Sequence, residues 1–546
     1  MKKTIGQSII KIMSIMFSMF FVVILFNTIL FNRMITIDFN IPLMIIGTIV
    51  IYFVLFGLYY IYNKKNWRFL EHIPKKSEIL CILLIFFIVQ YIIAKLSYAY
   101  IGWDCGEVIS GAFSLLQGQK FNTMYYTQYP NNVGMLLLMK YVFVIAKQLT
   151  DMTVISNAFF AAIIFFNIMV IDIAALFTFL TIKKVLGTKK AYFSLIFILP
   201  LIVFLPYIVI PYTDTLTMAF PIMTLYMYLT IKELPKNSIK KYLLIFLLGM
   251  AIVFGINLKP TVIIMPIAIC IIEFLNINKE TLKSFKEKIF KKIFYAILIV
   301  LIFSLGCGTT YFEHNKLKDK NLGKYISKED SELYSIPFTH FLMMGMQTRP
   351  NDTKEAGKNQ ILYGAFSGDD VINTTSIDGY KQKQEYNIKI VKERLKEFGA
   401  YGYFVFLYNK ANWILSDGTF FYGHWIVNDY YNKTDFARNI QKFINVENDM
   451  YINITSNVLQ IAWILITLGL VLSYDKNEND DSNKYVDIGK LAIIGIVLFI
   501  LLFEGRSRYL INHLPIFIFV GTYGITSSFS KFEKNIKKLV LTLKNK

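Results

Sequence analysis

Charged residues are scarce in this chain of 546 residues, of which only 17% are Asp, Glu, Lys or Arg, while 55% are hydrophobic. Soluble domains average about 25% charged and about 45–50% apolar residues. A soluble protein could not hide this much apolar surface, so the composition excludes an ordinary soluble enzyme. It predicts a chain that resides in a membrane.

Cysteine is scarce as well. The four cysteines are too few and too scattered for a disulfide framework or a zinc site. Cys81 and Cys270 fall inside apolar runs and are interpreted as packing residues. Cys105 and Cys307 can both lie near the outer face, and their spacing leaves open whether they pair. The sequence therefore predicts no metal site and no cofactor, and it leaves dependence on a divalent metal open.

Long apolar runs, in contrast, are plentiful. A membrane-crossing helix needs about 20 mostly apolar residues. The first such run is too long for a signal-peptide core and no cleavage site follows it, which predicts a retained span. We predict an all-α polytopic membrane protein with about 12 transmembrane helices. The predicted spans are 9–31, 42–62, 79–97, 154–180, 191–209, 215–232, 242–257, 260–277, 293–311, 456–474, 489–503 and 510–528.

Lysines set the predicted orientation. If the N-terminus is cytoplasmic and the spans alternate, every lysine-rich connection falls on the cytoplasmic side. These connections are 63–78, 183–190, 232–241, 279–292 and the tail after Ser530. The rule that cytoplasmic loops are rich in Lys and Arg then places both termini inside a cell membrane.

The charge distribution excludes a nucleic-acid partner. The large outer segment 312–455 holds 18 basic and 18 acidic residues, so the whole excess of +20 belongs to the rest of the chain. This segment is long enough for a small extracytoplasmic domain, α or mixed α/β, with a helix at 384–398 and strand or helix at 401–425. It divides the chain into a transmembrane core (1–311), the domain (312–455), the last spans (456–528) and a basic cytoplasmic tail (529–546).

The first outer loop, 98–153, carries two amphipathic segments, 106–117 and 133–147. They are too short or too charged to cross the membrane and are predicted to lie in the interface plane. Just ahead of the first segment stand Asp104 and Glu107, three residues apart, which a helix would place on one face. Two close carboxylates can accept a proton from a hydroxyl. Solvated caps at a helix start are the plainer interpretation.

Between the two amphipathic segments lies a polar and aromatic turn. Its residues Tyr129, Asn131 and Asn132 have side chains that can stack on a sugar or bind its hydroxyls. Aromatic belts also occur at any membrane interface, and taken alone this turn favours that simpler interpretation.

Further polar residues fall at outer ends of the predicted spans. Three of them are cations on the side that should be poor in cations. A charge at membrane depth costs about 2.5–3.5 kcal/mol, so it usually has a partner or a task. Ion pairing is one interpretation, and binding of a lipid phosphate is the other. The residues are Asp214, Lys259, Glu504, Arg506 and Arg508.

The order of these features carries a resemblance. An acid follows an early span, Gly118 ends a short helix, Tyr129-Pro130 precedes an interfacial helix, and Lys259-Pro260 and Glu-x-Arg-x-Arg-Tyr follow. This order resembles the GT-C superfamily of membrane glycosyltransferases, in the branch of dolichyl-phosphate-mannose protein mannosyltransferases and the aminoarabinose transferase of lipid A. The resemblance covers residues 79–310 and 489–528. The outer segment looks like that of glycosyltransferase-like proteins of Gram-positive bacteria.

Two departures from the family pattern bear on the site. The family commonly has adjacent Asp-Glu, whereas Cys105-Gly106 separates Asp104 from Glu107 here. The family also has Lys/His-Pro-Pro where this chain has Tyr-Pro-Asn-Asn. A basic phosphate ligand is therefore missing from that turn, and Lys259, Arg506 or Arg508 must serve.

The resemblance implies transfer of a sugar from a polyprenyl-phosphate donor to an extracytoplasmic acceptor, with inversion at the anomeric carbon. The acceptor would be a cell-wall polymer, a glycolipid or a protein. Asp104 would act as general base, with Glu107 orienting or sharing the proton. The cations would stabilise the leaving phosphate, and Asp214 with the turn Tyr129–Asn132 would contact sugar or acceptor. A lipid-linked donor also agrees with the lack of a nucleotide-binding signature.

Other functions stay open at this point. A polysaccharide polymerase or ligase would rely on arginines or a histidine in the outer segment, which has few arginines. A lipid or sugar transporter would carry charges near the midplane of its spans and show paired repeats. A purely structural membrane protein is a third possibility. The sugar, the acceptor and the oligomeric state are not readable from the sequence.

Overall fold

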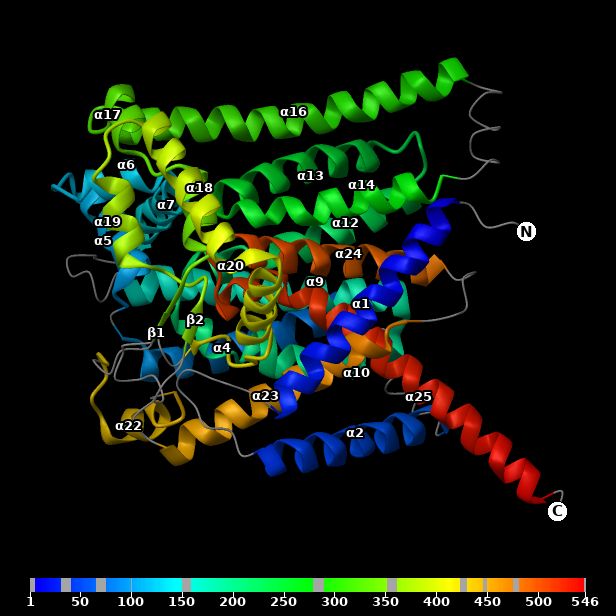
Figure 1. The fold of residues 1–546 in the computed structure, drawn as a ribbon. Helices are drawn as coiled ribbons and strands as arrows, with labels where there is room; N and C mark the ends of the chain where they lie inside the picture. Colours follow the sequence, from blue (N-terminus) through cyan, green and yellow to red (C-terminus); the bar gives the residue numbers. More distant parts are fainter. Residues whose placement is uncertain are drawn as a thin grey trace.

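The computed structural model describes residues 5–30, 41–64, 75–99, 101–149, 159–277, 289–350, 361–422, 430–444, 449–474 and 481–544. The chain forms a bundle of long helices that run roughly along one direction (Figure 1). Within the described residues, eleven helices are long and apolar enough to cross a membrane. The predicted all-α polytopic membrane fold is confirmed.

The long helices follow one another along the chain in alternating directions. They are α1 (Ile5–Leu30), α2 (Ile41–Lys64), α4 (Lys76–Ser97), α9 (Phe165–Leu186), α10 (Thr188–Ile198), α12 (Ala219–Glu233), α13 (Ile239–Leu258), α14 (Ile264–Leu275), α16 (Ile289–Leu322), α23 (Asp449–Leu472), α24 (Asp481–Leu502) and α25 (Leu514–Lys544).

Further elements lie between these helices, most of them short, although α20 has 36 residues. They are α5 (Trp103–Gln117), α6 (Thr123–Gln128), η1 (Pro130–Asn132), α7 (Val133–Leu149), η2 (Phe159–Ile164), η3 (Leu199–Val203), η4 (Pro206–Val209), α11 (Thr213–Leu216), η5 (Pro260–Ile263), α17 (Lys328–Tyr334), α18 (Phe338–Met344), β1 (Thr348–Pro350), β2 (Ile361–Tyr363), α19 (Gly368–Thr375), α20 (Tyr380–Leu415), α22 (Asp435–Gln441) and η6 (Ser507–His513).

Most predicted spans coincide with these helices. All except 215–232 and 260–277 match one of the eleven candidate spans. The first exception is interrupted after α11, which leaves α12 with only 15 residues. The second begins with a 3-10 turn at Pro260, which leaves α14 with 12 residues. The part of 154–180 before residue 159, and parts of the connections 63–78, 279–292 and 475–490, lie outside the described residues.

The helix at Pro130–Leu149, predicted to lie in the interface, is itself long and apolar enough to be a candidate span. In the structure α7 packs on α5. Figure 1 shows both, with α6, at the end of the bundle away from the chain termini. We call this the loop end, and the opposite end, where both termini lie, the termini end.

Ion pairs join the lysine-rich connections at the termini end. Lys184, at the end of α9, pairs with Glu233 at the end of α12. Glu273 near the end of α14 holds both Lys232 and Lys484 at 3.0 and 2.9 Å. The connections 183–190 and 232–241 therefore lie on the same side of the molecule, as the alternation of spans predicted.

Two predicted boundaries do not correspond to breaks in the helices. α16 continues past residue 311 to Leu322, and α25 continues past residue 528 to Lys544. Figure 1 shows the last part of α25 projecting beyond the bundle. In both helices polar residues simply extend the helix that the apolar run began, because Lys, Glu and Leu are all good helix formers.

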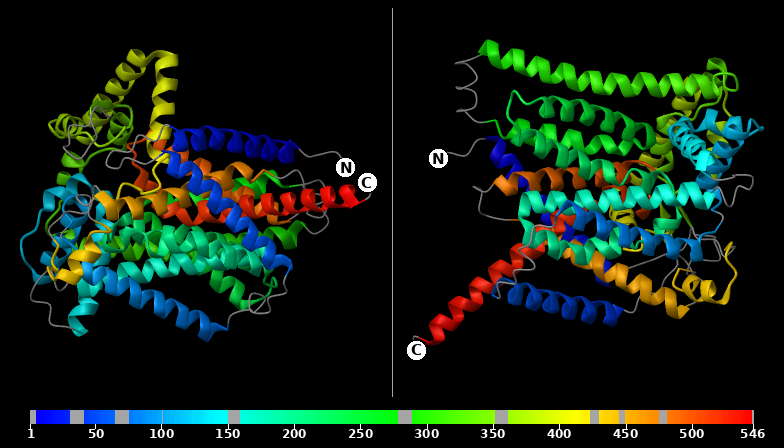
Figure 2. Two further views of the ribbon diagram at one scale, coloured as in Figure 1. Left: turned by 90° about the horizontal axis from the view of Figure 1, so that it is seen from below. Right: turned by 180° about the vertical axis from the view of Figure 1, so that it is seen from behind.

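The outer segment is mainly helical. α20 contains the helix predicted at 384–398 and continues to Leu415, so the aromatic stretch from residue 401 is helix up to Leu415 and forms turns from Ser416 onward. A positive φ of 61° at Gly399 kinks α20, and Figure 2 shows its two halves meeting at a steep angle. The strands β1 and β2 form one short antiparallel pair. Residues 423–425 of the predicted stretch lie outside the described part.

Glycines allow α23 and α25 to touch. A Cβ atom at Gly469 would lie 2.2 Å from the carbonyl oxygen of Gly521, and one at Gly524 only 1.8 Å from that of Gly469. Such contacts require glycine, because any side chain would push the two backbones apart. Trp463 of α23 is fully buried in the same interface and lies 5.3 Å from the ring of Phe517.

The cysteines do not pair. Cys105 and Cys307 are both free thiols. Cys105 is buried and donates to the carbonyl of Pro211 at 3.6 Å, whereas Cys307 donates to the carbonyl of Gly249 on α13. Burial raises the pKa of the Cys105 thiol. The disulfide that the spacing left open is therefore absent from the structure.

Candidate functional site

Five segments that are far apart in the sequence meet at the loop end. They are the start of α5, the turn before α7, the short helix α11, the junction of α13 with η5, and the turn that leads into η6. Together they hold almost every residue that the sequence singled out. The contacts among these residues define the candidate site.

Asp104 lies in the first turn of α5, where a helix start favours a carboxylate. Tyr125 of α6 donates a hydrogen bond of 2.8 Å to Asp104 Oδ1. The hydroxyl of Tyr212 lies 3.5 Å from Asp104 Oδ2. The carboxylate is therefore held from two sides by phenols and remains partly exposed.

Asn132 joins the same group. Its Nδ2 donates to the hydroxyl of Tyr125 at 2.6 Å, and its Oδ1 lies 3.4 Å from the hydroxyl of Tyr212. Asn131 donates to Asn132 Oδ1 at 3.3 Å. The ring of Tyr129 packs 5.1 Å from that of Tyr125. The predicted turn thus reaches Asp104 through Tyr125.

The phenols around Asp104 resist ionisation. Burial is the main cause, and the nearby carboxylate adds to it. Together they raise the pKa of Tyr125 and Tyr212 far above the ordinary value. They also raise the pKa of Tyr129 to about 12. Each phenol therefore keeps its proton near neutral pH and can act as a donor.

Glu107 occupies the next position on the same face of α5, as the spacing predicted. It is partly exposed. Its backbone carbonyl accepts a 3.0 Å hydrogen bond from Tyr126. The structure thus places Glu107 beside Asp104 in the helix.

Asp214 lies between two cations and is almost fully buried. Lys259 donates to its Oδ1, and Arg508 Nε stands 3.8 Å from its Oδ2. Asp214 is in α11, Lys259 directly follows α13, and Arg508 is in η6. One carboxylate therefore ties three separate segments together, which agrees with the ion-pairing interpretation of these charges.

Arg508 is also enclosed by aromatic rings. Its guanidinium carbon lies 4.5 Å from the centre of the Trp103 ring, 5.1 Å from that of Tyr212 and 5.2 Å from that of Tyr509. Ring faces attract cations, and arginine stacks on them in particular. Tyr212 thus contacts Arg508 with its ring and Asp104 with its hydroxyl.

Glu504 contacts two further residues of the site, Tyr509 and Arg506. Tyr509 donates to Glu504 Oε2 at 2.5 Å, and Arg506 Nε lies 3.7 Å from Oε1. The ring of Tyr509 lies 5.0 Å from the ammonium of Lys259, which joins this group to Asp214. All three cations predicted for the phosphate are therefore within one connected set of contacts.

Three residues in or beside this set have strained backbones. Trp103 has a φ of 45°, and Phe420 and Phe421 have φ values of 52° and 65°. Bulky residues rarely adopt this region, and such strain clusters at functional sites. Trp103 faces Arg508, and the ring of Phe421 lies 5.7 Å from the guanidinium of Arg506.

Sequence reasoning missed the residues that support the chosen ones. Trp103, Tyr125, Tyr212 and Tyr509 stand next to predicted residues or within the same turns, and their aromatic character was the available signal. Nothing in the sequence around Asp417 indicated that it belongs to the site. It is buried after α20, and its carboxylate accepts hydrogen bonds from Ser507 and Thr419, both at 2.6 Å. It thereby fixes the start of η6 from the outer segment.

The described residues contain no group of three or more His, Cys, Asp or Glu side chains that could hold a metal ion. The chemistry available among these residues is therefore a partly exposed carboxylate with phenol donors, next to three cations and aromatic faces. Such a set can accept a proton at one point and bind an anion close by.

Comparisons with known proteins place the chain among integral membrane proteins. No curated protein and no solved structure matches it. A family model described as "conserved hypothetical integral membrane protein" matches residues 5–529. The chain therefore belongs to this family of integral membrane proteins.

Proposed function

We propose that this chain is a glycosyltransferase of the GT-C type, which moves a sugar from a polyprenyl-phosphate donor to an extracytoplasmic acceptor. The acceptor is a hydroxyl of a cell-wall polymer, a glycolipid or a protein. In this proposal the termini end faces the cytoplasm and the loop end faces outward, as the lysine-rich connections favour. No nucleotide is needed, because the lipid phosphate is the leaving group.

One observation carries the proposal. The carboxylate of Asp104 and the guanidinium of Arg508 lie on either side of one side chain, Tyr212, whose hydroxyl faces the acid and whose ring faces the cation. A proton acceptor and a binding site for a leaving phosphate must be close together for displacement at one carbon. Because Tyr212 contacts both groups, the proton acceptor and the phosphate-binding cation are separated by a single tyrosine side chain.

The acceptor hydroxyl gives its proton to Asp104 while its oxygen forms a bond to the anomeric carbon. The bond between that carbon and the phosphate oxygen breaks from the opposite face, which inverts the configuration. The bonding electrons leave with the polyprenyl phosphate. Lys259, Arg506 and Arg508 stabilise the negative charge that grows on this phosphate.

The aromatic residues near Asp104 suit a sugar. Tyr129 has a partly exposed ring and Asn131 an exposed amide at the same turn, which the buried Asn132 supports from behind. Glu107, one helical turn after Asp104, is placed to orient the acceptor or share its proton. Asp214 keeps the two cations Lys259 and Arg508 in place. It therefore acts on the sugar or acceptor indirectly, through the positions of these two side chains.

The test is direct. Purified protein with a polyprenyl-phosphate sugar and an acceptor should release polyprenyl phosphate. Asp104→Asn should lower that release by about 100- to 10,000-fold, the usual contribution of a general base. Glu233→Gln, a carboxylate change at the termini end, is the matched control and should leave release unchanged.

Two results would overturn the proposal. Full release by a folded Asp104→Asn protein would remove the base assignment. Movement of a sugar or lipid across a vesicle membrane, with no glycosidic bond formed by the unaltered protein, would remove the transferase assignment.

A further inference from the structure

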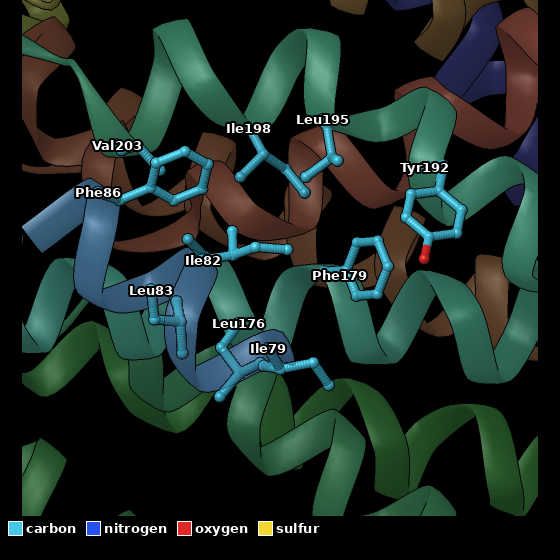
Figure 3. Close-up of a pocket in the computed structure, with 11 residues that line it drawn as sticks. Ile79, Ile82, Leu83, Phe86, Leu176, Phe179, Tyr192, Leu195, Ile198 and Val203 are labelled. Carbon is cyan, nitrogen blue, oxygen red and sulfur yellow. The ribbon is translucent and has the colours of Figure 1, made fainter. Parts of the chain in front are cut away.

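A second feature lies far from the candidate site, in the half of the bundle nearer the termini end. A cavity of about 80 Å³ lies between the first half of α4 and the helices α9 and α10. Figure 3 shows Ile82 and Phe86 of α4 facing Ile198 and Leu195 across it. The remaining lining residues are Ile79, Leu83, Ala175, Leu176, Phe179, Tyr192 and Val203.

The wall of this cavity suits hydrocarbon and not water. Among its eleven lining residues, the Tyr192 hydroxyl is the one polar side-chain group. A buried water needs two to four polar partners, so this cavity offers too few. The ring of Phe179 packs edge-on against that of Tyr192, with 5.5 Å between the ring centres.

The cavity adjoins a surface that must face lipid. α4 exposes large apolar side chains along its length, including Leu80, Leu84 and Ile85, each more than half exposed. Only 11% of its membrane-spanning stretch is buried inside the protein. In an integral membrane protein such a surface lies against acyl chains. A cavity beside it is therefore reached from the hydrocarbon of the membrane.

Lysines stand at the termini end of the same walls. On α9, Lys183 follows the lining residue Phe179 by four positions, and on α10, Lys189 precedes the lining residue Tyr192 by three. Residues three or four apart lie on one face of a helix. Both lysines therefore continue the cavity walls toward the membrane surface, on either side of the turn at Gly187.

The charge around this turn is positive. Lys184 and Lys190 add to the pair, although Lys184 is engaged by Glu233. On the opposite wall Lys75 precedes α4, and Glu78 is the facing acid, which accepts a hydrogen bond from the Lys75 backbone and interacts with Tyr192. Among the described side chains, these walls thus carry five lysines near their termini end against the two carboxylates Glu78 and Glu233. Clusters of lysine beside a membrane helix attract anionic lipid.

We propose that this cavity binds one acyl chain of an anionic glycerophospholipid whose phosphate lies on Lys183 and Lys189. The apolar wall fixes the chain, and the lysines at its end select a negative headgroup over a zwitterionic one. The lipid fills the gap between α4 and the α9–α10 pair. This site is independent of glycosyl transfer and lies at the opposite end of the bundle from Asp104.

The test uses the full-length protein in bilayers that contain phosphatidylglycerol and phosphatidylcholine. Native mass spectrometry should show a monomer that retains one phosphatidylglycerol. The double variant Lys183→Gln/Lys189→Gln should lower that retention by about tenfold or more, because each lysine contributes on the order of 1 kcal/mol near an anionic surface. The control Lys236→Gln/Lys240→Gln removes the same charge from exposed lysines of the α12–α13 connection and should retain the lipid.

A second measurement tests the cavity itself. In a Tyr192→Trp variant, phosphatidylglycerol with brominated chains should quench the added fluorescence more than brominated phosphatidylcholine does. Ala175→Phe, which fills the cavity, should abolish this difference. Equal retention by both lysine double variants, or quenching that does not depend on the headgroup, would overturn the proposal. A lipid-free dimer in the mass spectrum would also overturn it and would assign the cavity to a second copy of the chain.

Discussion

The hydroxyl of Tyr125 donates a 2.8 Å hydrogen bond to Asp104 while it accepts one of 2.6 Å from Asn132. This phenol is therefore the link between the first acid of α5 and the turn before α7. Burial keeps it protonated, so the hydrogen bond always runs toward the carboxylate.

We expect Tyr125→Phe to slow sugar transfer by about 10- to 100-fold, because a hydrogen bond to a charged group contributes about 1.5–3 kcal/mol. The carboxylate would lose the donor that orients it, and Asn132 would lose its acceptor. Release of polyprenyl phosphate at saturating donor measures the effect. Tyr126→Phe, which removes a hydroxyl bonded to the Glu107 backbone, is the neighbouring control. An equal loss in both variants would argue against a special role for Tyr125.

Arg508→Lys should weaken donor binding even though the charge is kept. Lysine cannot stack a planar group on the rings of Trp103 and Tyr212, nor offer a forked donor to phosphate. We expect the KM for the polyprenyl-phosphate sugar to rise by about tenfold or more, with a smaller change in the KM for the acceptor. The exposed Arg438, changed to Lys, is the control. A rise in the acceptor KM alone would contradict the assignment.

The ion pairs of Asp214 predict unequal effects on stability. Asp214→Asn leaves two buried cations, Lys259 and Arg508, without their carboxylate, whereas Lys259→Met leaves Asp214 with Arg508. Breaking a buried pair costs about 3–5 kcal/mol. We therefore expect Asp214→Asn to lower the melting temperature more than Lys259→Met. The double variant should be less damaged than the sum of the two, and simple additivity would show that the contact contributes little.

His340 predicts a pH dependence of stability. It is fully buried in α18, and its Nδ1 lies 2.8 Å from the Thr374 hydroxyl. Burial lowers its pKa from 6.5 to about 4, with Asp370 acting in the opposite direction and Arg394 in the same one. The unfolded chain then binds more protons than the folded one between about pH 4 and about pH 6.5, so the free energy of unfolding falls as the pH falls through that window.

The expected size is about 3 kcal/mol across that window, since each pKa unit corresponds to about 1.4 kcal/mol. His340→Gln keeps a polar partner for Thr374 and removes the titration, so its melting temperature should depend less on pH. Thermal unfolding of both proteins in detergent between about pH 4 and about pH 7 measures the difference. Parallel curves would assign the acid sensitivity to other groups.

The positions of most spans were predictable, because they depend on local composition. Apolar runs of sufficient length identified most of the helices, and the lysines identified which connections lie together. The exceptions have local causes in the backbone. Pro260 starts η5 and shortens α14, and the break after α11 shortens α12. A hydropathy pattern does not predict these interruptions, because it reports how apolar a segment is and not where its helix breaks.

The contacts of the site were only partly predictable. Asp104, Asp214 and Arg508 were identifiable as charges at the ends of spans, where an isolated charge is costly. Which charge pairs with which depends on how α11, α13 and η6 meet, and no single segment encodes that. Asp417 was missed for the same reason, since its partner Ser507 is 90 positions away.

The glycine contacts between α23 and α25 restrict how the site can move. Because the backbones touch at Gly469, Gly521 and Gly524, neither helix can slide past the other without a steric clash. η6, which carries Arg508, leads directly into α25. This contact therefore fixes the position of η6 along the bundle. In the proposed transferase, any adjustment to substrates of different size would then come from the opposite wall, formed by α5 and α6.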